Sequence, residues 1–289
     1  GGRDPGEGQR RFLNGPERFL RLVAEARRAV APVPDAVVGI APHSLRAVTP
    51  EGLAEVLAAT PAGPVHIHIA EQVKEVEECL AWSGRRPVDW LLGNAPVDGR
   101  WCLVHATHMD PGETAGLARS GAVAGLCPIT EANLGDGIFE GPAYLEASGR
   151  FGVGSDSNVE ITAPGELRML EYGQRLAHRA RNVMALNEGE SVGRRLYEAA
   201  LAGGAQASGR RIGAIAPGCR ADLVVLDAGH PDLATVAGDR WLDAYVFVAG
   251  RAAINRVVVG GRTVVEGGRH AARAEVAARY ARVLARVAA

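Results

Sequence analysis

Short apolar runs that end in polar residues alternate with helical stretches between residues 36 and 156. This alternation predicts a parallel β-sheet flanked by helices. The carboxyl ends of parallel strands meet at one rim, and four of the five runs carry a His or Asp near that end, where barrel enzymes place their active sites. Five strands do not close an eight-stranded barrel, so we expect either an open sheet or a (β/α)8 barrel without its first three βα units. The runs are Ala36–His43, Val65–Glu71, Trp101–His108, Gly121–Thr130 and Arg150–Asp156.

The stretches outside these runs have helical periodicity. Phe19, Leu20 and Val23 are apolar residues at helical spacing and predict an amphipathic helix over Pro16–Val30. Further helices are expected over residues 49–60, 71–84, 110–121 and 164–183.

A change of pattern at about Gly213 marks a second structural unit. Short antiparallel strands with Gly turns, and no helix between them, are predicted over residues 212–230, 244–250 and 254–269. An Ala-rich helix is predicted at the end of the chain. We therefore divide the chain into a barrel portion (1–211), a small β subdomain (212–270) and a C-terminal helix (271–289).

The charge balance excludes two classes of partner. The chain has 32 Lys and Arg residues against 33 Asp and Glu residues, so bulk charge would attract neither nucleic acid nor an anionic membrane surface. No run approaches the roughly 18 apolar residues of a membrane span, and the beginning of the chain lacks the apolar core of a secretory signal. The four cysteines form no paired motif, which favours a reducing, cytoplasmic location.

Two histidines and a glutamate stand at the end of the second apolar run. His66 and His68 are two residues apart, so on a strand both project from the same face. Two imidazoles on one face suit a metal site or a proton relay, and Glu71 lies just past the strand, within reach of the same cavity. The alternative is that one histidine merely packs or forms a hydrogen bond inside the fold.

Further ionisable residues stand at the neighbouring strand ends. His105 and His108 are three residues apart, so we expect His105 to face the site and His108 to lie in a loop. Asp156 ends a strand of small residues, where a carboxylate is costly unless it is paired or bound to metal; capping of the next helix is the alternative.

His43 and Arg46 leave another strand end together. An arginine there suits bidentate recognition of a carboxylate, and a surface salt bridge is the alternative for Arg46.

His68, Glu71, His105 and Asp156 fall in order on successive strand ends. Zinc accepts His nitrogen and carboxylate oxygen, and a catalytic zinc site leaves one position open for water. Zinc lowers the pKa of that water toward neutrality, and a nearby carboxylate can carry its proton to a leaving group. Together these residues predict hydrolysis of a C–N bond in a small-molecule substrate.

The motifs that carry these residues resemble those of the amidohydrolase superfamily. They are HIHIAE, LVHATHM, CPITEANLGDGIF and GVGSDSN, followed by GELRMLEYGQRL and PGCRADLVVLD. Within the deaminase branch of the superfamily, PHSLR, EANLGDGIF and SDSNVEITAPGELRMLEYGQRL are most similar to the formimidoylglutamate deiminases of histidine degradation. The resemblance runs from about Gln9 through nearly the whole chain.

The resemblance implies a role for each residue at the rim. His68 and Asp156 would bind one zinc ion, and Asp156 would also take a proton from the attacking water. Glu71 would be the proton shuttle, and His105 would stabilise the attacking hydroxide or the tetrahedral centre.

The same resemblance implies the substrate. His43 and Arg46 would hold the carboxylates of a glutamate moiety. The implied reaction is N-formimino-L-glutamate plus water giving N-formyl-L-glutamate plus ammonia.

One motif of the family has no counterpart here. Family members carry HxH on the first barrel strand, which supplies two further zinc ligands, whereas the only HxH of this chain is His66 and His68, matching the fifth strand. The resemblance therefore implies strands four to eight of a metal-dependent hydrolase (β/α)8 barrel, N-terminally incomplete, with part of a small β-sandwich subdomain. We expect this chain alone to bind zinc weakly, and to form a homodimer or pair with a complementing N-terminal segment.

Two other functions stay open on the sequence. One is another deaminase of the branch that acts on a purine-type ring; an aromatic-lined pocket would favour it, but only 5% of the residues are aromatic. The other is a non-catalytic remnant that binds a partner through the barrel surface, which the absence of the first HxH would favour.

Overall fold

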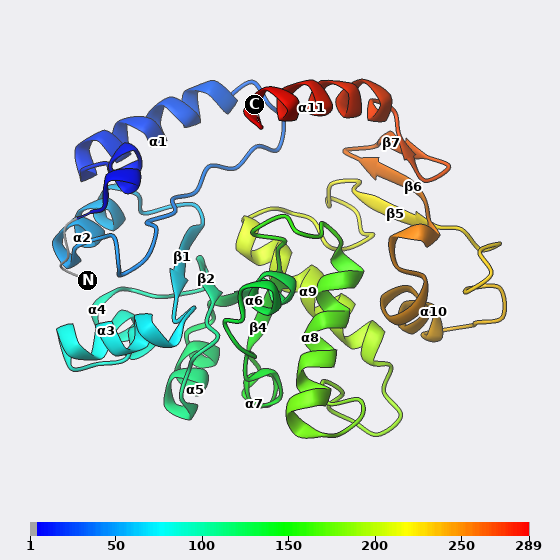
Figure 1. Cartoon of the computed structure of the whole chain (residues 1–289), viewed down its shortest axis with the longest axis horizontal. Helices are drawn as coiled ribbons and strands as arrows, with labels where there is room; N and C mark the ends of the chain where they lie inside the picture. The colour runs from blue at the N-terminus through cyan, green and yellow to red at the C-terminus, as the bar shows by residue number, and fades with distance from the viewer. Residues whose placement is uncertain (1–4, 289) are drawn as a thin grey trace.

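The computed structural model describes residues 5–288, and a four-stranded parallel sheet lies at its centre (Figure 1). The register pairs Val65 with Trp101 and Ile69 with His105, so the first two strands begin and end together. The carboxyl ends of the strands therefore share one rim, as the sequence predicts. The strands lie side by side in chain order: β1 (Val65–Ile69), β2 (Trp101–His105), β3 (Val123–Leu126) and β4 (Arg150–Val153).

Alternating burial explains why these short segments form strands. In β1, Val65, Ile67 and Ile69 are at most 1% exposed, whereas the two histidines between them are partly exposed. The buried side chains join one core with apolar residues of the surrounding helices. Burial of a large aliphatic side chain contributes about 1.5–3 kcal/mol, so the apolar face fixes which way the histidines project.

Helices follow the strands, and most of them begin with a proline, which the first helical turn accommodates. Helix α5 begins with a capping box. The Asp110 side chain accepts a hydrogen bond from the Glu113 amide at 2.8 Å, and the Glu113 side chain accepts one from the Asp110 amide at 3.0 Å. The five helices predicted from the sequence in this part of the chain are confirmed. The helices are α1 (Pro16–Val30), α2 (Pro50–Ala59), α3 (Val73–Ser83), α4 (Pro87–Asn94), α5 (Pro111–Ser120), α6 (Pro128–Leu134), α7 (Gly141–Glu146), α8 (Ala163–His178) and α9 (Val192–Ser208), with a 3-10 turn, η1 (Glu7–Phe12), before them.

The strand predicted over Ala36–His43 is wrong. The segment runs beside β1 but pairs with it only through isolated bridges, at Ile40 and at Ser44. Pro42 lies between these bridges and has no amide hydrogen to donate, so a continuous ladder cannot form. Across residues 5–288 the parallel sheet is consequently open, with β1 and β4 as its outer strands.

Helix α9 covers β4, and this packing depends on a glycine. A Cβ at Gly203 would collide with the carbonyl oxygen of Phe151 in β4. Near the end of α9, the Gln206 Nε2 donates to the carbonyl oxygens of Gly99 and Gly121, which precede β2 and β3. α9 therefore closes the end of the sheet opposite the rim and leaves the rim open.

The C-terminal unit contains a single antiparallel sheet, in which Leu223 pairs with Val258 and Val257 with Val265. One sheet does not make a sandwich, so within residues 5–288 only the antiparallel character of the prediction is confirmed. The strands are β5 (Leu223–Leu226), β6 (Ile254–Val259), β7 (Arg262–Glu266) and β8 (Arg269–His270).

The strand predicted over residues 244–250 is also wrong. The chain between β5 and β6 is helical: α10 (Arg240–Ala244), a π-helical turn η2 (Tyr245–Ala249) and a 3-10 turn η3 (Gly250–Ala253). Tyr245, Val246 and Ala249 are buried and share one helical face. An apolar run this short fits a strand or a helix equally, and tertiary packing decides between them.

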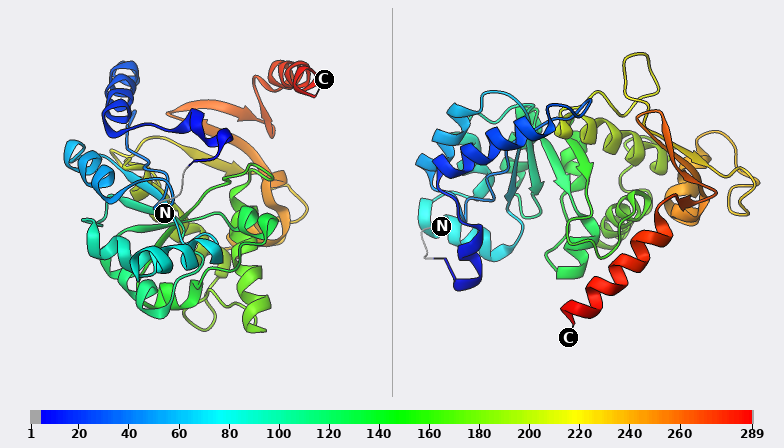
Figure 2. Two further views of the ribbon diagram at one scale, coloured as in Figure 1. Left: turned by 60° about the vertical axis from the view of Figure 1, so that its left-hand side comes forward. Right: turned by 90° about the horizontal axis from the view of Figure 1, so that it is seen from above.

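The helices α1 and α11 (Arg273–Val287) lie at the periphery, away from the parallel sheet (Figure 2). The predicted C-terminal helix is thus confirmed. No helix between residues 5 and 288 combines the length and apolar character needed to cross a membrane.

Replacement of Gly203 by Ala is expected to lower the free energy of unfolding by about 1–3 kcal/mol, because the added methyl group overpacks against β4. Gly204→Ala is the matched control in the same helix: its Cβ would meet no atom within 4 Å, and alanine there should stabilise by about 0.5–1 kcal/mol. Urea denaturation measures both variants. Equal effects of the two substitutions would contradict the packing of α9 on β4.

Candidate active site

Four ionisable side chains named by the sequence lie along the rim. His68 is in β1 and His105 is the last residue of β2. Glu71 follows β1 by two residues, and Asp156 follows β4 by three. The register brings the end of β1 beside the end of β2, so the side chains of His68, Glu71 and His105 become neighbours although 37 residues separate the two histidines.

His68 is held in one tautomer. Its Nδ1 lies 2.8 Å from the carbonyl oxygen of His43, and because a carbonyl only accepts, Nδ1 carries the proton. The Nε2 of the neutral ring is therefore free to bind a metal or to accept a proton. His66 projects from the same face, but its Nε2 lies 2.8 Å from the carbonyl oxygen of Ala207 in α9, away from the rim. Of the two histidines, only His68 is available at the site.

Three imidazole rings stand in a row along the rim. The ring centroids of His43 and His68 are 5.0 Å apart, and those of His68 and His105 are 5.6 Å apart. Burial is the main cause that lowers the pKa of His43, and the charges of His68 and Arg46 lower it further. The charge of Glu71 raises it but does not outweigh them. His43 is therefore neutral at pH 7.

The Glu71 carboxylate is paired inside the site. Arg46 Nη2 donates to Glu71 Oε2 at 2.7 Å and lies 3.9 Å from Glu75 Oε2. The buried Glu75 accepts the backbone N–H of Glu71 at 2.9 Å, which fixes the loop. Burial works to raise the pKa of Glu71, but the hydrogen bond from Arg46 and the charges of His105, Arg46 and His68 outweigh it, so the pKa lies below its usual value. The structure thus pairs Arg46 with a carboxylate of the site.

His105 lies between two carboxylates. Its Nδ1 is 3.3 Å from Glu131 Oε1, its Nε2 is 3.7 Å from Glu71 Oε1, and its side chain is 1% exposed. Burial works to lower the pKa of His105, whereas the hydrogen bond to Glu131 and the charges of Glu71, Glu131 and Asp156 raise it, with a net increase. Contacts from Arg46 through Glu71 and His105 to Glu131 form one network, which we call the rim network.

His108, in contrast, lies outside the rim network. Its Nε2 is 2.7 Å from the carbonyl oxygen of Asp136, in the loop after α6. The structure thus places His105 in the rim network and His108 outside it.

Asp156 is exposed and does not cap the following helix, because Thr162 is the residue that precedes α8. Its φ is 41°, and Ala70, His105 and Ala106 also have positive φ values of 48°, 70° and 50°. A left-handed conformation costs a non-glycine residue roughly 1–2 kcal/mol. Such strain concentrates where surrounding structure must aim side chains, and here it marks three of the strand ends.

Three buried glutamates near the rim were not predicted from the sequence as site residues. Glu75, Glu131 and Glu166 are at most 3% exposed, and each accepts a backbone N–H of a rim loop. Burial is the main cause that raises the pKa of Glu166 to about 7, with the charges of Glu131, Glu160 and Asp156 adding to it against a hydrogen bond from Ile129. Glu75 and Glu166 stand in predicted helical segments, where a glutamate ordinarily faces solvent, and Glu131 directly follows the predicted strand Gly121–Thr130.

The donors available to a metal are few. Among residues 5–288, no group of three or more His, Cys, Asp or Glu side chains is arranged to hold a metal ion. His68 Nε2 and the Asp156 carboxylate are donors of the types that zinc accepts. The donor types at the rim therefore fit zinc, but the described residues supply fewer ligands than a catalytic zinc site uses.

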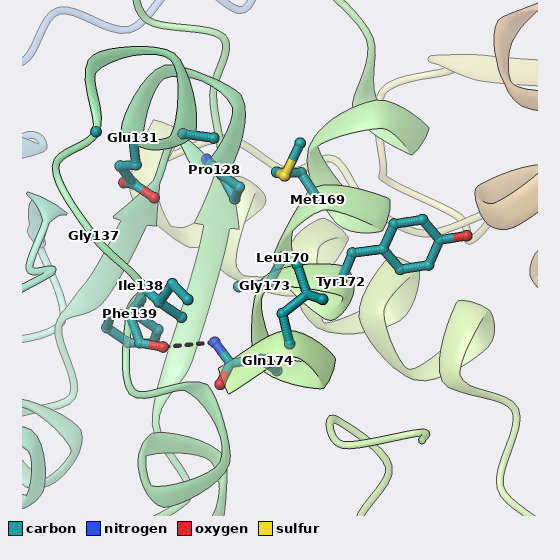
Figure 3. Close-up of a pocket in the computed structure, with 13 residues that line it drawn as sticks. Pro128, Glu131, Gly137, Ile138, Phe139, Met169, Leu170, Tyr172, Gly173 and Gln174 are labelled. Carbon is teal, nitrogen blue, oxygen red and sulfur yellow. Dashed lines mark hydrogen bonds between the residues drawn. The ribbon is translucent and has the colours of Figure 1, made fainter. Parts of the chain in front are cut away.

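A pocket of ≈ 310 Å³ lies behind Glu131, between α6, the loop that follows it and α8 (Figure 3). Ile138, Met169 and Leu176 give it apolar walls, and Glu131 is its only charged lining residue. An apolar wall with one carboxylate is unsuited to an anionic ligand. A cationic group for such a ligand, the Arg46 guanidinium, stands at the rim instead.

Comparison with known proteins gives consistent matches. The amidohydrolase family model matches residues 14–264. The chain is 55% identical over 287 residues to a formimidoylglutamate deiminase of Pseudomonas aeruginosa, which covers 98% of this chain and 63% of the relative. It is 32% identical over 224 residues to a 5-methylthioadenosine/S-adenosylhomocysteine deaminase of Desulfovibrio desulfuricans, covering 76% of this chain and 50% of that protein.

Two solved structures share the fold. An amidohydrolase from Brucella melitensis superimposes with a TM-score of 0.95 at 51% identity, covering all of this chain and 64% of that one. An adenosine deaminase from Xanthomonas campestris with bound zinc superimposes with a TM-score of 0.83 at 25% identity, covering 94% of this chain and 62% of that one. The chain thus spans less than two thirds of the length of each of these proteins.

Replacement of Arg46 by Met is expected to raise the pKa of Glu71, because burial is then opposed only by the charges of His105 and His68. The lowered pKa in the folded protein means that the pair stabilises above the unfolded-state pKa and that this contribution is lost as the pH falls through the folded-state value. The variant should therefore lose about 1 kcal/mol at neutral pH and less in acid.

Carbon-13 NMR of the glutamate carboxyl groups follows the titration, and urea denaturation at several pH values follows the stability. Arg21→Met is the control, because Arg21 forms an exposed pair with Glu17 in α1. An unchanged Glu71 pKa in the Arg46 variant would contradict the rim network.

Proposed function

Because this chain belongs to the amidohydrolase family, we propose that its rim forms part of the active site of a zinc-dependent deiminase that hydrolyses N-formimino-L-glutamate to N-formyl-L-glutamate and ammonia. The rim network beside His68 is the observation that carries this proposal, because it joins a proton acceptor, a hydrogen-bond donor and a cation at one strand edge. The similarity to the Pseudomonas deiminase supports N-formimino-L-glutamate as the substrate. The four cysteines of the chain are unpaired, which agrees with a cytoplasmic enzyme.

His68 and Asp156 are the residues that would hold zinc. The His68 Nδ1–H donates to the carbonyl oxygen of His43, which leaves Nε2 for the metal. A histidine that binds metal usually donates its other ring N–H in this way. Zinc, when bound, acts as a Lewis acid that activates water near neutral pH. Further ligands would come from outside the residues described here.

Glu71 is the proposed proton shuttle. Its lowered pKa keeps the carboxylate unprotonated at pH 7, so it can accept a proton and pass it to the amidine nitrogen that leaves as ammonia. Asp156 would accept a proton from the attacking water. The contact of Glu71 Oε2 with Arg46 orients the other oxygen, Oε1, toward His105 and the reacting atoms.

His105 is the proposed stabiliser of the tetrahedral centre. The raised pKa and the flanking carboxylates favour a protonated ring, which can donate a hydrogen bond to developing negative charge. Its burial increases the strength of that interaction, because the local dielectric constant is low.

Arg46 and His43 are the proposed partners of the substrate carboxylates. A guanidinium has five N–H donors, so Arg46 can bind a substrate carboxylate and still keep its hydrogen bond to Glu71. A deaminase for a purine-type ring is the second candidate, favoured by the Desulfovibrio relative. The ring itself carries no carboxylate for Arg46 to pair with, and Arg46 therefore favours the dicarboxylate substrate.

The chain, supplied with zinc and co-expressed with the part of the Pseudomonas relative outside the matched region, is expected to release ammonia from N-formimino-L-glutamate. Glu71→Gln should lower the rate by about 10²–10⁴-fold, because the amide cannot shuttle a proton. Glu77→Gln, exposed on α3, is the matched control and should keep the rate. Ammonia from 5-methylthioadenosine instead would support the second candidate, and release from neither substrate would contradict an enzymatic role and favour a binding remnant.

The chain alone is expected to retain well under one zinc ion per molecule after dialysis, because its rim provides two donors. His68→Asn should lower the retained zinc further, and His178→Asn, exposed at the end of α8, should not. Metal content is measured by mass spectrometry of the dialysed protein. One tightly bound zinc ion per chain would contradict the proposed ligand set.

A further inference from the structure

The buried Glu131 makes the closest side-chain contact to His105. The Glu131 Oε1 lies 3.3 Å from His105 Nδ1, and the two side chains are 4% and 1% exposed. Glu71 lies on the opposite side of the ring, 3.7 Å from Nε2. The proposed function uses the Nε2 side and leaves the contact on the Nδ1 side unexplained.

Glu131 cannot easily move from this position. Its Oε1 also accepts the backbone N–H of Cys127 at 3.0 Å, and its own amide donates to the Cys127 carbonyl at 2.9 Å. Cys127 directly follows β3, so the carboxylate is tied to the rim by the backbone of the strand next to that of His105. Most of the pocket wall behind it is apolar (Figure 3), and the amide of the lining residue Gln174 donates to the Phe139 carbonyl oxygen at 2.6 Å.

The charge of Glu131 determines which ring nitrogen carries the proton. A carboxylate only accepts, so a proton on Nδ1 makes a hydrogen bond to Oε1. A proton on Nε2 alone would leave the Nδ1 lone pair facing a carboxylate oxygen in a buried site, where an unpaired polar contact costs about 1–3 kcal/mol. The Nδ1–H tautomer is therefore favoured, and Nε2 is directed to Glu71 and the rim.

We propose that Glu131 is a positioning residue that holds His105 with its Nδ1–H toward β3, so that Nε2 faces the reacting atoms. This inference rests on the proposed function for its kinetic consequence, but its structural part is independent of any activity. The alternative is that Glu131 only caps α6 through the Cys127 amide.

The direct test is the tautomer of His105 in the chain labelled with nitrogen-15 histidine. Long-range proton–nitrogen NMR distinguishes the two ring nitrogens, and His105→Asn identifies the signals by their absence. The spectra are recorded at a pH high enough to deprotonate the His105 ring. The neutral ring is then expected to carry its proton on Nδ1, and Glu131→Met should move it to Nε2, where Glu71 is the remaining carboxylate. A proton on Nε2 in the unmodified chain, or the same tautomer in the Met variant, would overturn the proposal.

The Met variant also removes the acceptor of the Cys127 amide, so Glu131→Gln provides a variant that keeps both hydrogen bonds and removes the charge. In the ammonia assay Glu131→Met should lower kcat by about 10–100-fold with KM within about twofold, because Glu131 does not touch the substrate. Glu131→Gln should keep most of kcat, because its amide oxygen can still accept from His105 Nδ1. Glu171→Gln is the matched control: this buried glutamate accepts backbone N–H groups of a distant loop, and its loss should change stability but not kcat.

An unchanged kcat in Glu131→Met, or an equal loss of kcat in Glu131→Gln and Glu131→Met, would overturn the positioning role. Absence of ammonia release from the unmodified chain would contradict the proposed function instead, and the tautomer measurement would still decide the role of Glu131.

Discussion

The charged side chains of the rim network depend on partners of opposite charge. A carboxylate or an imidazolium removed from water costs several kcal/mol unless it is paired and hydrogen-bonded. Arg46, Glu71, His105 and Glu131 meet this requirement jointly, with contacts of 2.7, 3.7 and 3.3 Å. Loss of one member removes a partner from each of its neighbours, so the four side chains and the loops that carry them form one cooperative unit.

The parallel sheet is what makes this unit possible. Arg46 follows the segment beside β1, Glu71 follows β1, His105 ends β2, and Glu131 follows β3. In-register strands bring these loops together without long connections. The left-handed backbone at Ala70, His105 and Ala106 adds strain that the sheet and its helices offset. Stability is thus concentrated in the sheet and its glycine-dependent contact with α9, while the rim carries the chemistry.

The sequence predicts the parts of this fold that depend on local periodicity. Alternation in VHIHI identifies both the strand and the face of its histidines, because one face is buried. The strand prediction is wrong at residues 36–43, where Pro42 interrupts the pairing with β1. It is also wrong at residues 244–250, where tertiary packing makes an apolar run helical. Glu131 was not predicted as a site residue, because it lies just past the predicted strand Gly121–Thr130 and only the contact with β2, 26 residues away in sequence, gives it a role.

The measurement that tests the central claim most directly is an experimental structure of the chain with N-formyl-L-glutamate, the product, and zinc. The account predicts that the product carboxylates contact Arg46 and His43, that its formyl group lies beside His68 and Glu71, and that His105 keeps its contact with Glu131. Product bound elsewhere, for example in the apolar pocket lined by Met169 and Leu176, or with no contact to Arg46, would contradict it.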